Sequence, residues 1–348
     1  MTVSAPLRAA LIGCGNIGAR GHAPAYAQIA AVELAAVCDV DETAARRVAA
    51  ATGAEACLDY RRLLDRPDIH LVDICTPTDT HAAIALAALA AGKHVLCEKP
   101  LAPTLAEAQA MINAAHRHGR RLMVGYVRRF DPRYRAIKEA IAAGEIGRPL
   151  YIRRADRQRL PFPAESWFWH PERGGGVILD IGIHQADLFR WYFEAEPIAV
   201  YAVGRQVRDV ARRAGSYDHA FLIFRFPDDR MGLGEAAWSY PPGFEPYFAA
   251  LDVVGSRGKI HYDDGDAAPM FIVDEEGRAY HPRYFRFMAT LEQAFVEEIR
   301  HFAQCILDDR APLIGDDDAL AAQAMAVAAQ LSAQRGEPVR LPLTEERP

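Results

Sequence analysis

The chain has 348 residues, a length that predicts two domains, each large enough to bury a core of its own. Its residues are 51% hydrophobic and 25% charged, which is typical of a globular protein in water. The 40 basic and 46 acidic residues give a net charge of −6. This balance argues against a nucleic-acid or anionic-membrane partner, because either would require a basic surface.

The first 125 residues alternate between strand-like and helix-like patterns, as a parallel sheet requires. The expected strands are Leu7–Ile12, Glu33–Cys38, Leu71–Cys75, His94–Cys97 and Arg121–Val124. The expected helices lie near residues 17–30, 42–51, 60–64, 80–91 and 104–118. We therefore predict an α/β Rossmann domain, built on a doubly wound parallel sheet, over residues 1–125.

From residue 126 the pattern changes to helices followed by clustered strands. Helical stretches are expected at 131–143 and 175–193. The strand-like runs are 149–158, 198–208, 217–226, 230–239, 251–256, 258–263 and 269–274. Helices near 289–307 and 316–334 follow, and residues 227–229 and 275–277 are typical of hairpin turns. Residues 126–348 are thus expected to form a C-terminal α+β domain.

The six cysteines form no C-x-x-C pair, and four of them fall at or near the ends of expected strands. We interpret them as small buried residues in a reducing compartment, and we expect neither disulfides nor a metal site. The most apolar segment, 82–91, is about half as long as a bilayer-spanning helix, and the N-terminus lacks the features of a signal peptide. The sequence therefore predicts a cytoplasmic protein with no membrane partner.

A glycine-rich turn follows the first expected strand directly. It reads Gly13-Cys14-Gly15-Asn16-Ile17-Gly18, and Asp39 ends the next strand 21 residues after Gly18. A strand, this turn, a helix and an acidic residue about 20 positions further on are typical of a dinucleotide site. Gly13 would permit the tight turn, Gly15 would let the backbone approach the pyrophosphate, and Gly18 would let the helix pack closely on the sheet. The helix N-terminus offers N–H groups to the phosphates.

Asp39 favours NAD over NADP. Its carboxylate can accept hydrogen bonds from both hydroxyls of the adenosine ribose, whereas it would repel a 2′-phosphate. The next residues, Val40 and Asp41, supply no arginine to receive that phosphate. We expect Arg46 and Arg47 to lie on the solvated face of the following helix.

Cys97-Glu98-Lys99-Pro100 ends the strand expected at 94–97. In an open α/β sheet, ligands bind beyond the carboxyl ends of the strands, so Lys99 would point toward the nicotinamide end of a dinucleotide. The alternative is a surface lysine at a strand-to-turn junction.

A second cluster runs from Gly174-Gly175-Gly176 through Asp180 to His184. The three glycines before a helical pattern indicate a close approach of backbone to ligand, and Gly182 would leave space beside the imidazole. Asp180 and His184 are four residues apart and would share a helix face. Such a pair is either a proton-transfer unit or a structural polar pair.

Taken together, these motifs resemble the glucose–fructose oxidoreductase, inositol dehydrogenase and MocA (Gfo/Idh/MocA) family of dehydrogenases. The resemblance runs from about residue 5 to residue 195, and beyond that point only a compatible strand pattern remains. It rests on Gly13–Gly18, Asp39, Cys75-Thr76-Pro77 with His81, Gly92–Val95, Glu98-Lys99-Pro100, Val124-Gly125-Tyr126, Arg128-Arg129-Phe130 and Gly174–His184.

The resemblance implies an NAD-dependent enzyme whose C-terminal domain has a large, open, mostly antiparallel sheet, through which the chain forms a homodimer or homotetramer. It implies three catalytic residues. His184 would take the hydroxyl proton, Lys99 would hydrogen-bond the reacting oxygen, and Asp180 would orient its neighbours. The implied cofactor residues are Gly13, Gly15, Asn16, Ile17, Gly18, Asp39, Thr76, Pro77, His81, Glu98 and Lys99.

The implied reaction is oxidation of a secondary hydroxyl on a sugar or cyclitol, with an inositol as the nearest type of substrate. Arg128, Arg157, Trp167 and Tyr240 are hypothetical substrate contacts. The segment Trp167-Phe168-Trp169 would either cover the site or pack in the core. Three alternatives remain open at this level: an NADPH-dependent keto-sugar reductase, a glycosidase that recycles NAD, and a non-catalytic dinucleotide-binding sensor.

Overall fold

A computed structural model describes residues 6–343 apart from 161, 242–247, 265–269 and 281–290. The chain folds into two compact units. The first contains the residues up to Asp131 together with Ala289–Leu320, and the second contains Pro132–Met288 and the residues from Ala321 onward. Within the described residues, no helix is both long enough and apolar enough to span a membrane.

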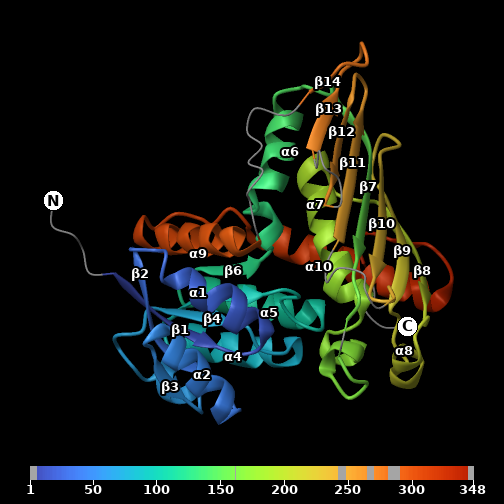
Figure 1. The fold of residues 1–348 in the computed structure, drawn as a ribbon. Coiled ribbons are helices and arrows are strands. Elements are labelled where there is room, and N and C mark those ends of the chain that lie inside the picture. Colours follow the sequence, from blue (N-terminus) through green and yellow to red (C-terminus); the bar gives the residue numbers. More distant parts are fainter. Residues whose placement is uncertain (1–5, 161, 242–247, 265–269, 281–290, 344–348) are drawn as a thin grey trace. The chain divides into compact units, whose positions relative to one another are not determined.

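The first unit is built on a six-stranded parallel sheet in the order β3-β2-β1-β4-β5-β6 (Figure 1). The strands are β1 (Leu7–Ile12), β2 (Val32–Cys38), β3 (Glu55–Cys57), β4 (Leu71–Ile74), β5 (His94–Glu98) and β6 (Leu122–Gly125). This confirms the doubly wound sheet. The sequence missed β3, because three residues, two of them exposed, carry no hydrophobic alternation.

The helices of this sheet are α2 (Glu42–Thr52), α3 (Arg61–Leu64), α4 (Thr78–Ala90) and α5 (Leu105–Arg117). The segment expected to form one helix over 17–30 is instead a π-helical turn, η1 (Gly18–His22), followed by the short helix α1 (Ala23–Tyr26). Asp41 begins α2, since its carboxylate accepts hydrogen bonds from the N–H groups of Thr43 and Ala44. A short 3-10 turn, η2 (Val127–Arg129), follows β6.

The helix α9 (Leu291–Leu307) belongs to the first unit, although the expected domain boundary at residue 125 assigned it to the second. Its apolar face packs on η1 and α1. Gly21 leaves room for the Phe295 ring, because a Cβ there would lie 2.8 Å from Phe295 Cε2. The helix α10 (Asp316–Arg335) begins in the first unit and ends in the second. A single boundary along the chain therefore does not describe the units, because α9 returns to the first unit after the strands of the second.

The second unit carries a nine-stranded sheet in the order β14-β13-β12-β11-β7-β10-β9-β8-β15. Its neighbours pair antiparallel except β7 and β10, which pair parallel. The strands are β7 (Pro149–Arg157), β8 (Ala199–Arg205), β9 (His219–Arg225), β10 (Met231–Ala237), β11 (Phe248–Gly255), β12 (Lys259–Asp263), β13 (Met270–Val273), β14 (Ala279–Tyr280) and β15 (Val339–Arg340). The large, mostly antiparallel sheet and both hairpins are confirmed.

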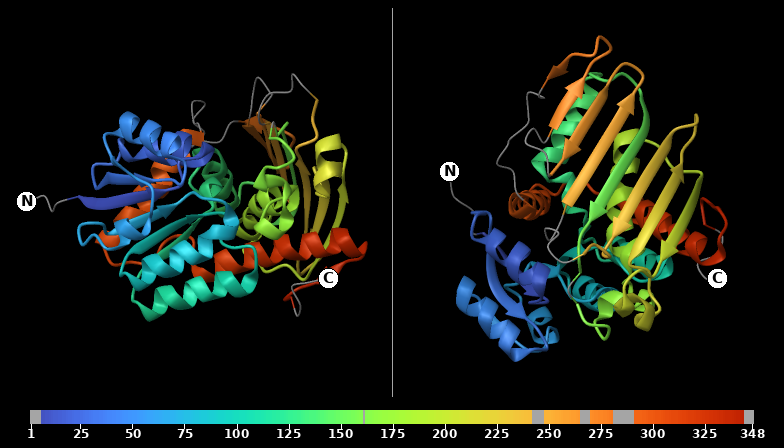
Figure 2. Two further views of the ribbon diagram at one scale, coloured as in Figure 1. Left: turned by 90° about the horizontal axis from the view of Figure 1, so that it is seen from below. Right: turned by 45° about the vertical axis from the view of Figure 1, so that its right-hand side comes forward.

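The helices of the second unit are α6 (Pro132–Ala142), the π-helical turn η5 (Ile178–Gly182), α7 (Ile183–Phe193) and the short α8 (Asp209–Ala214), which the sequence analysis missed. Two 3-10 turns, η3 (Trp167–Trp169) and η4 (Pro171–Arg173), precede η5. The η5–α7 segment packs on β7 and β10, where the Gln185 amide donates to Asp156 Oδ2 at 2.8 Å. Helices lie behind only one face of the sheet in the right-hand view of Figure 2.

Candidate functional site

The glycine-rich turn has the geometry that its spacing predicts. Gly13 has a φ of +102°, and a Cβ there would lie 2.5 Å from the backbone of Cys75, at the end of β4. A Cβ on Gly18 would lie 2.0 Å from the carbonyl oxygen of Gly13. At Gly15, in contrast, nothing lies within 4 Å of where a Cβ would be. Gly13 and Gly18 thus serve the turn itself, whereas Gly15 leaves space outside it for a ligand.

Asp39 lies beside this turn at the end of β2. Its Oδ2 accepts a hydrogen bond from the N–H of Cys14 at 2.7 Å, and its Oδ1 accepts one from the N–H of Asp41 at 2.9 Å. Each oxygen of a carboxylate can accept a second hydrogen bond. The carboxylate is therefore fixed by the backbone and retains the capacity to bind two ribose hydroxyls.

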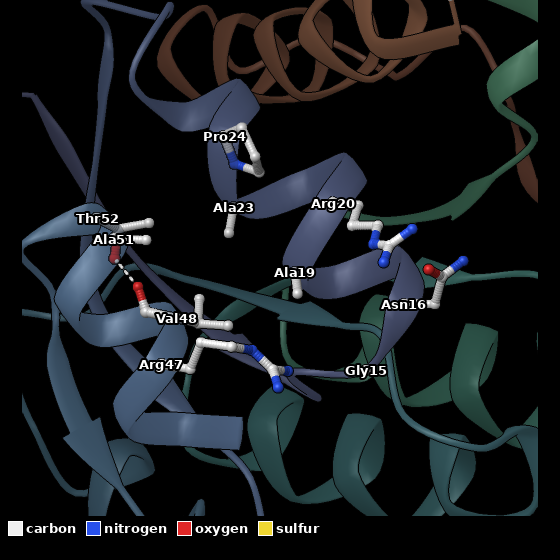
Figure 3. A pocket seen from close by; sticks show the side chains of 10 residues that line it. All are labelled: Gly15, Asn16, Ala19, Arg20, Ala23, Pro24, Arg47, Val48, Ala51 and Thr52. Atoms are coloured by element: carbon white, nitrogen blue, oxygen red, sulfur yellow. Dashed lines mark hydrogen bonds between the residues drawn. The ribbon is translucent and has the colours of Figure 1, made fainter. Parts of the chain in front are cut away.

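A pocket of about 580 Å³ adjoins the turn, between η1, α1 and α2 (Figure 3). Arg20 and Arg47 extend from η1 and α2 on either side of Ala19. Arg47 Nη2 lies 3.4 Å from the carbonyl oxygen of Cys14. The pocket is lined by Gly15, Asn16, Ala19, Arg20, Ala23, Pro24, Arg47, Val48, Ala51 and Thr52.

The expectation that Arg46 and Arg47 both lie on a solvated helix face is confirmed, since both are exposed on α2. Arg46 pairs with Glu42 one turn earlier, and Arg47 extends toward the glycine-rich loop. A guanidinium therefore lies beside the turn at which the phosphates are expected.

The turn after β5 carries Lys99, and His81 fixes this turn from behind. His81 Nδ1 lies 3.0 Å from the carbonyl oxygen of Pro100, and Nε2 lies 2.8 Å from that of Thr76. The ring is 1% exposed, and this burial lowers the pKa of His81. His81 thus joins the loops that follow β4 and β5. That His81, Thr76 and Pro77 line the cofactor groove stays a prediction.

A fully buried cluster of polar side chains lies behind Lys99. His22 Nδ1 is 2.8 Å from Asp73 Oδ2, and His22 Nε2 is 3.1 Å from Glu98 Oε1. The Tyr26 hydroxyl donates to Asp73 Oδ2 at 2.9 Å, and Glu98 Oε2 accepts from the N–H of Lys99 at 3.1 Å. Glu98, also expected to line the groove, is therefore the link between the cluster and Lys99.

The charges of this cluster depend on one another. Burial alone would lower the pKa of His22, but the Asp73 carboxylate holds it well above its ordinary value. Burial alone would raise the pKa of Glu98, but His22 and Lys99 hold it below its ordinary value. These shifts favour an imidazolium at His22, with one ring nitrogen facing each carboxylate.

The described residues include two overlapping groups with polar atoms within 4.8 Å of one another. These are His22 with Asp73 and Cys75, and His22 with Glu98 and Glu298. Because both ring nitrogens of His22 face carboxylates, we interpret both groups as parts of one hydrogen-bonded network. The expectation that the chain holds no metal stays a prediction.

The second unit carries Asp180 on η5 and His184 on α7. His184 is 8% exposed, Asp180 is half-buried, and the N–H of Asp180 donates to the carbonyl oxygen of Gly176 at 2.9 Å. Because η5 is π-helical, these two residues are not one regular α-helical turn apart. Their proposed partner Lys99 belongs to the first unit, so the structure describes the two parts of the predicted catalytic set separately.

The glycines around this helix serve contacts inside the protein. A Cβ on Gly175 would lie 2.6 Å from the carbonyl oxygens of Trp167 and Phe168, and Gly176 has a φ of +89°. A Cβ on Gly182 would lie 3.0 Å from Leu222 Cδ1. The predicted close approach is therefore to the chain's own backbone, and the space at Gly182 faces β9 rather than the imidazole.

The hypothetical substrate residues lie in different surroundings. Arg128 is 6% exposed on η2 in the first unit. On the other unit, Arg157 Nη2 pairs with Glu235 Oε2 at 2.7 Å, and the Tyr240 hydroxyl donates to Glu235 Oε1 at 3.1 Å. Since side chains alternate along β7, Arg157 lies on the face opposite Asp156 and α7. Substrate contact by these three residues stays a prediction.

The aromatic segment divides between core and surface. Trp169 is completely buried, donates its Nε1–H to the carbonyl oxygen of Phe162 at 3.2 Å and packs edge-to-face on Trp238. Trp167 is half-exposed and stacks on Phe168 with ring centroids 4.2 Å apart. Trp169 therefore packs in the core, whereas Trp167 and Phe168 keep the partial exposure that a substrate contact needs.

The residues of the first unit fit a dinucleotide. Gly15 leaves space at the helix N-terminus, Asp39 is positioned for a ribose, and Lys99 follows β5, two strands from β1 in the same sheet. The sequence analysis missed His22, Asp73 and Glu298, because single buried polar residues on a strand or helix follow no spacing rule. The sequence signal that could have found them is the presence of His22 and Glu298 among apolar residues of helical patterns.

Comparisons with known proteins identify the family of the chain. The model of the Gfo/Idh/MocA oxidoreductases, with an NAD-binding Rossmann fold, matches residues 7–126, and the model of the GFO/IDH/MocA C-terminal domain matches residues 134–261. The chain is 30% identical to scyllo-inositol 2-dehydrogenase (NAD(+)) of Bacillus subtilis, over 96% of both chains. It is 29% identical to myo-inositol 2-dehydrogenase of Thermotoga maritima, over 96% of this chain and 98% of that protein.

Solved structures share the fold along the whole chain. A levoglucosan dehydrogenase in complex with NADH and levoglucosan superposes with a TM-score of 0.86 at 25% sequence identity. The match covers 97% of this chain and 100% of that one. Both units thus have counterparts in a single known protein.

Proposed function

The chain belongs to the Gfo/Idh/MocA family of oxidoreductases, and from this premise we propose that it is an NAD-dependent dehydrogenase of a sugar or cyclitol, with an inositol as the first substrate to test. The observation that carries the proposal is the arrangement of the first unit. Gly15, Asp39 and Lys99 follow β1, β2 and β5 of one parallel sheet, so all three lie at the edge where such sheets bind ligands.

The proposed chemistry is oxidation of a secondary alcohol to a ketone. The hydroxyl proton passes to His184, and the carbon loses a hydride. A bound nicotinamide supplies the acceptor for that hydride. Lys99 donates a hydrogen bond to the reacting oxygen and stabilises the negative charge that develops on it, while Asp180 orients His184. Gly13, Gly15, Asn16, Ile17, Gly18 and Asp39 hold the adenosine and phosphate part of the cofactor.

The preference for NAD rests on Asp39, whose carboxylate binds ribose hydroxyls and repels a 2′-phosphate. Arg47 lies on the other side of the same turn and would favour an added phosphate. Since Asp39 directly follows β2, where the ribose is expected, we propose that its charge outweighs that of Arg47. The inositol dehydrogenases among the relatives support a cyclitol as substrate.

The test is the absorbance of reduced nicotinamide when the purified protein is mixed with NAD or NADP and a panel of inositols, aldoses, anhydro-sugars and sugar acids. We expect turnover with NAD and an inositol, and loss of at least about a hundredfold in Lys99→Ala and His184→Ala, in line with the contribution of a general base or of an oxyanion donor. His116→Ala and Lys259→Ala, at exposed positions, are the matched controls and should keep full activity. Tight NAD binding without turnover on any panel member would contradict the proposal and favour an NAD-recycling glycosidase or a sensor.

A further inference from the structure

Glu298 on α9 is a completely buried carboxyl group. Within the described residues, neither of its oxygens has a hydrogen-bond partner. Its neighbour Glu297 is half-buried and pairs with Arg300 at 2.5 Å. A carboxylate without a partner is strongly disfavoured in a buried site, so Glu298 requires either a proton or a cation that neutralises it.

The groups that face Glu298 come from four other elements of the first unit. Oxygens of Glu298 and Glu98 and a nitrogen of His22 all lie within 4.8 Å of one another. The titratable groups around them are His22 on η1, Tyr26 on α1, Asp73 on β4, Cys75 after β4, Glu98 on β5 and Lys99 beyond it. This cluster holds three carboxyl groups around one imidazole.

An imidazolium at His22 and the Lys99 ammonium offset the carboxylates of Asp73 and Glu98, so the charges of the cluster balance only if Glu298 is neutral. The two ring nitrogens of His22 face Asp73 and Glu98. Nothing is left on the imidazole for a third carboxylate. In agreement with this, burial and the adjacent Glu98 raise the pKa of Glu298 well above its ordinary value.

The carboxyl group of Glu98 is confined on every side. Its Oε1 faces His22, its Oε2 accepts from the N–H of Lys99, and a Cβ on Gly125 would lie 3.2 Å from Oε1. Glu98 lies within 4.8 Å of Glu298, and its two oxygens contact His22 and the N–H of Lys99. A rotation of the Glu298 side chain is therefore enough to bring a proton on Glu298 to a group that contacts the backbone at Lys99.

We propose that Glu298 is a positioning residue whose uncharged carboxyl group, within 4.8 Å of Glu98, turns toward Glu98 and donates a hydrogen bond to it, and that Glu98 thereby fixes the turn that presents Lys99 to the substrate. The effect on turnover rests on the proposed function, because it assumes that Lys99 contacts the reacting oxygen. The protonation of Glu298 does not depend on any substrate. The protonation and its effect on turnover can therefore be tested, and can fail, independently.

The first experiment reads the proton directly. The infrared spectrum of the full-length protein near neutral pH should contain the carbonyl stretch of a protonated carboxylic acid, and that band should vanish in Glu298→Gln but persist in Glu297→Gln. An unchanged band in Glu298→Gln, or a stoichiometric divalent cation in the dialysed wild-type protein, would overturn the proposal.

Stability gives a second reading of the same proton. A folded-state pKa above the unfolded one means that the folded protein holds a proton that the unfolded chain releases, so stability falls as pH rises above the ordinary range of a glutamic acid. Glu298→Gln lacks this proton. Its melting temperature should therefore rise relative to the wild type between pH 6 and pH 9, whereas that of Glu297→Gln should not. A difference in melting temperature between Glu298→Gln and the wild type that does not change with pH would contradict the proposal.

The third reading is turnover. Glu298→Leu cannot donate to Glu98 and should lower kcat at least tenfold with little change in the KM for NAD, while Glu298→Gln, which keeps an N–H donor, should restore it. If no substrate is found, the NMR signal of ¹³C-methylated Lys99 takes the place of kcat. The chemical shift of this signal should change in Glu298→Leu and should have the wild-type value in Glu298→Gln. Equal behaviour of the two variants would overturn the positioning role and leave the proposed function intact.

Discussion

Single residues around the glycine-rich turn already carry most of the proposed cofactor selectivity. Asp39 is anchored by two backbone N–H groups, one from the turn itself, so its carboxylate needs no rearrangement to receive a ribose. Such a fixed acceptor binds more tightly than a mobile one, because its conformational entropy is already lost.

Replacing Asp39 with alanine removes charge-assisted hydrogen bonds to the ribose and the repulsion of a 2′-phosphate. We expect Asp39→Ala to weaken NAD binding roughly 10- to 100-fold, which is the contribution of one such hydrogen bond. The ratio of the affinity for NAD to that for NADP should decrease or fall below one. Titration of nucleotide fluorescence with NADH and NADPH measures both effects. Asp41→Ala, which removes only the cap of α2, is the control, and an equal loss in the two variants would assign the effect to the fold.

Residue patterns alone cannot identify the buried cluster, because each member has an ordinary sequence environment. His22 lies inside a helix, Asp73 inside a buried strand, and Glu298 on the apolar face of a helix 225 residues beyond Asp73. Their relation exists only because α9 returns to the first unit and packs on η1.

At the level of elements, the two helices that carry the motifs both begin with a π-helical turn. η1 holds the end of the glycine-rich motif and His22, and η5 holds Asp180. A π-helical turn inserts one residue into the helical repeat and is common at functional sites. Hydrophobic periodicity does not reveal it, since one extra residue shifts the register of a single turn.

Close packing between elements predicts one sensitive position in the second unit. A Cβ on Gly232 of β10 would lie 2.4 Å from Phe189 Cδ2 on α7. Gly232→Ala therefore overpacks this contact, and we expect a loss of about 1–3 kcal/mol in the free energy of unfolding, measured by chemical denaturation. Gly315→Ala, where nothing lies within 4 Å of the added methyl group, should change stability little. Equal stability of the two variants would show that α7 moves freely away from the sheet.

At the level of the whole molecule, one face of the nine-stranded sheet exposes large apolar side chains to solvent. Phe221 is 57% exposed, Tyr151 43% and Met231 38%, and the register places Met231 directly beside Tyr151. These residues alternate with the buried side chains that face α7. Exposed apolar patches of this kind mark association surfaces.

We therefore retain the prediction that the chain forms a homo-oligomer through this face. Phe221→Lys combined with Met231→Lys should shift the molar mass in light scattering toward that of a monomer, because two buried charges would face each other across the interface. Leu307→Lys, an exposed leucine on α9, is the control and should leave the mass unchanged. A wild-type protein that is monomeric at high concentration would refute the prediction.

The Rossmann sheet, the glycine-rich turn, Asp39 and most elements of the second sheet follow from local pattern. Strand and helix periods are set by neighbouring residues, and Gly13 is required wherever a turn needs a positive φ. The family could be inferred for the same reason, since its motifs are short and contiguous.

The assignment of α9 to the first unit, the contacts of His81 with the loops after β4 and β5, and the proximity of Glu98 and Glu298 were decided only by tertiary structure. Each depends on residues that are distant in the chain and on burial. Burial changes which charge state is stable, and a linear pattern of residues does not contain it.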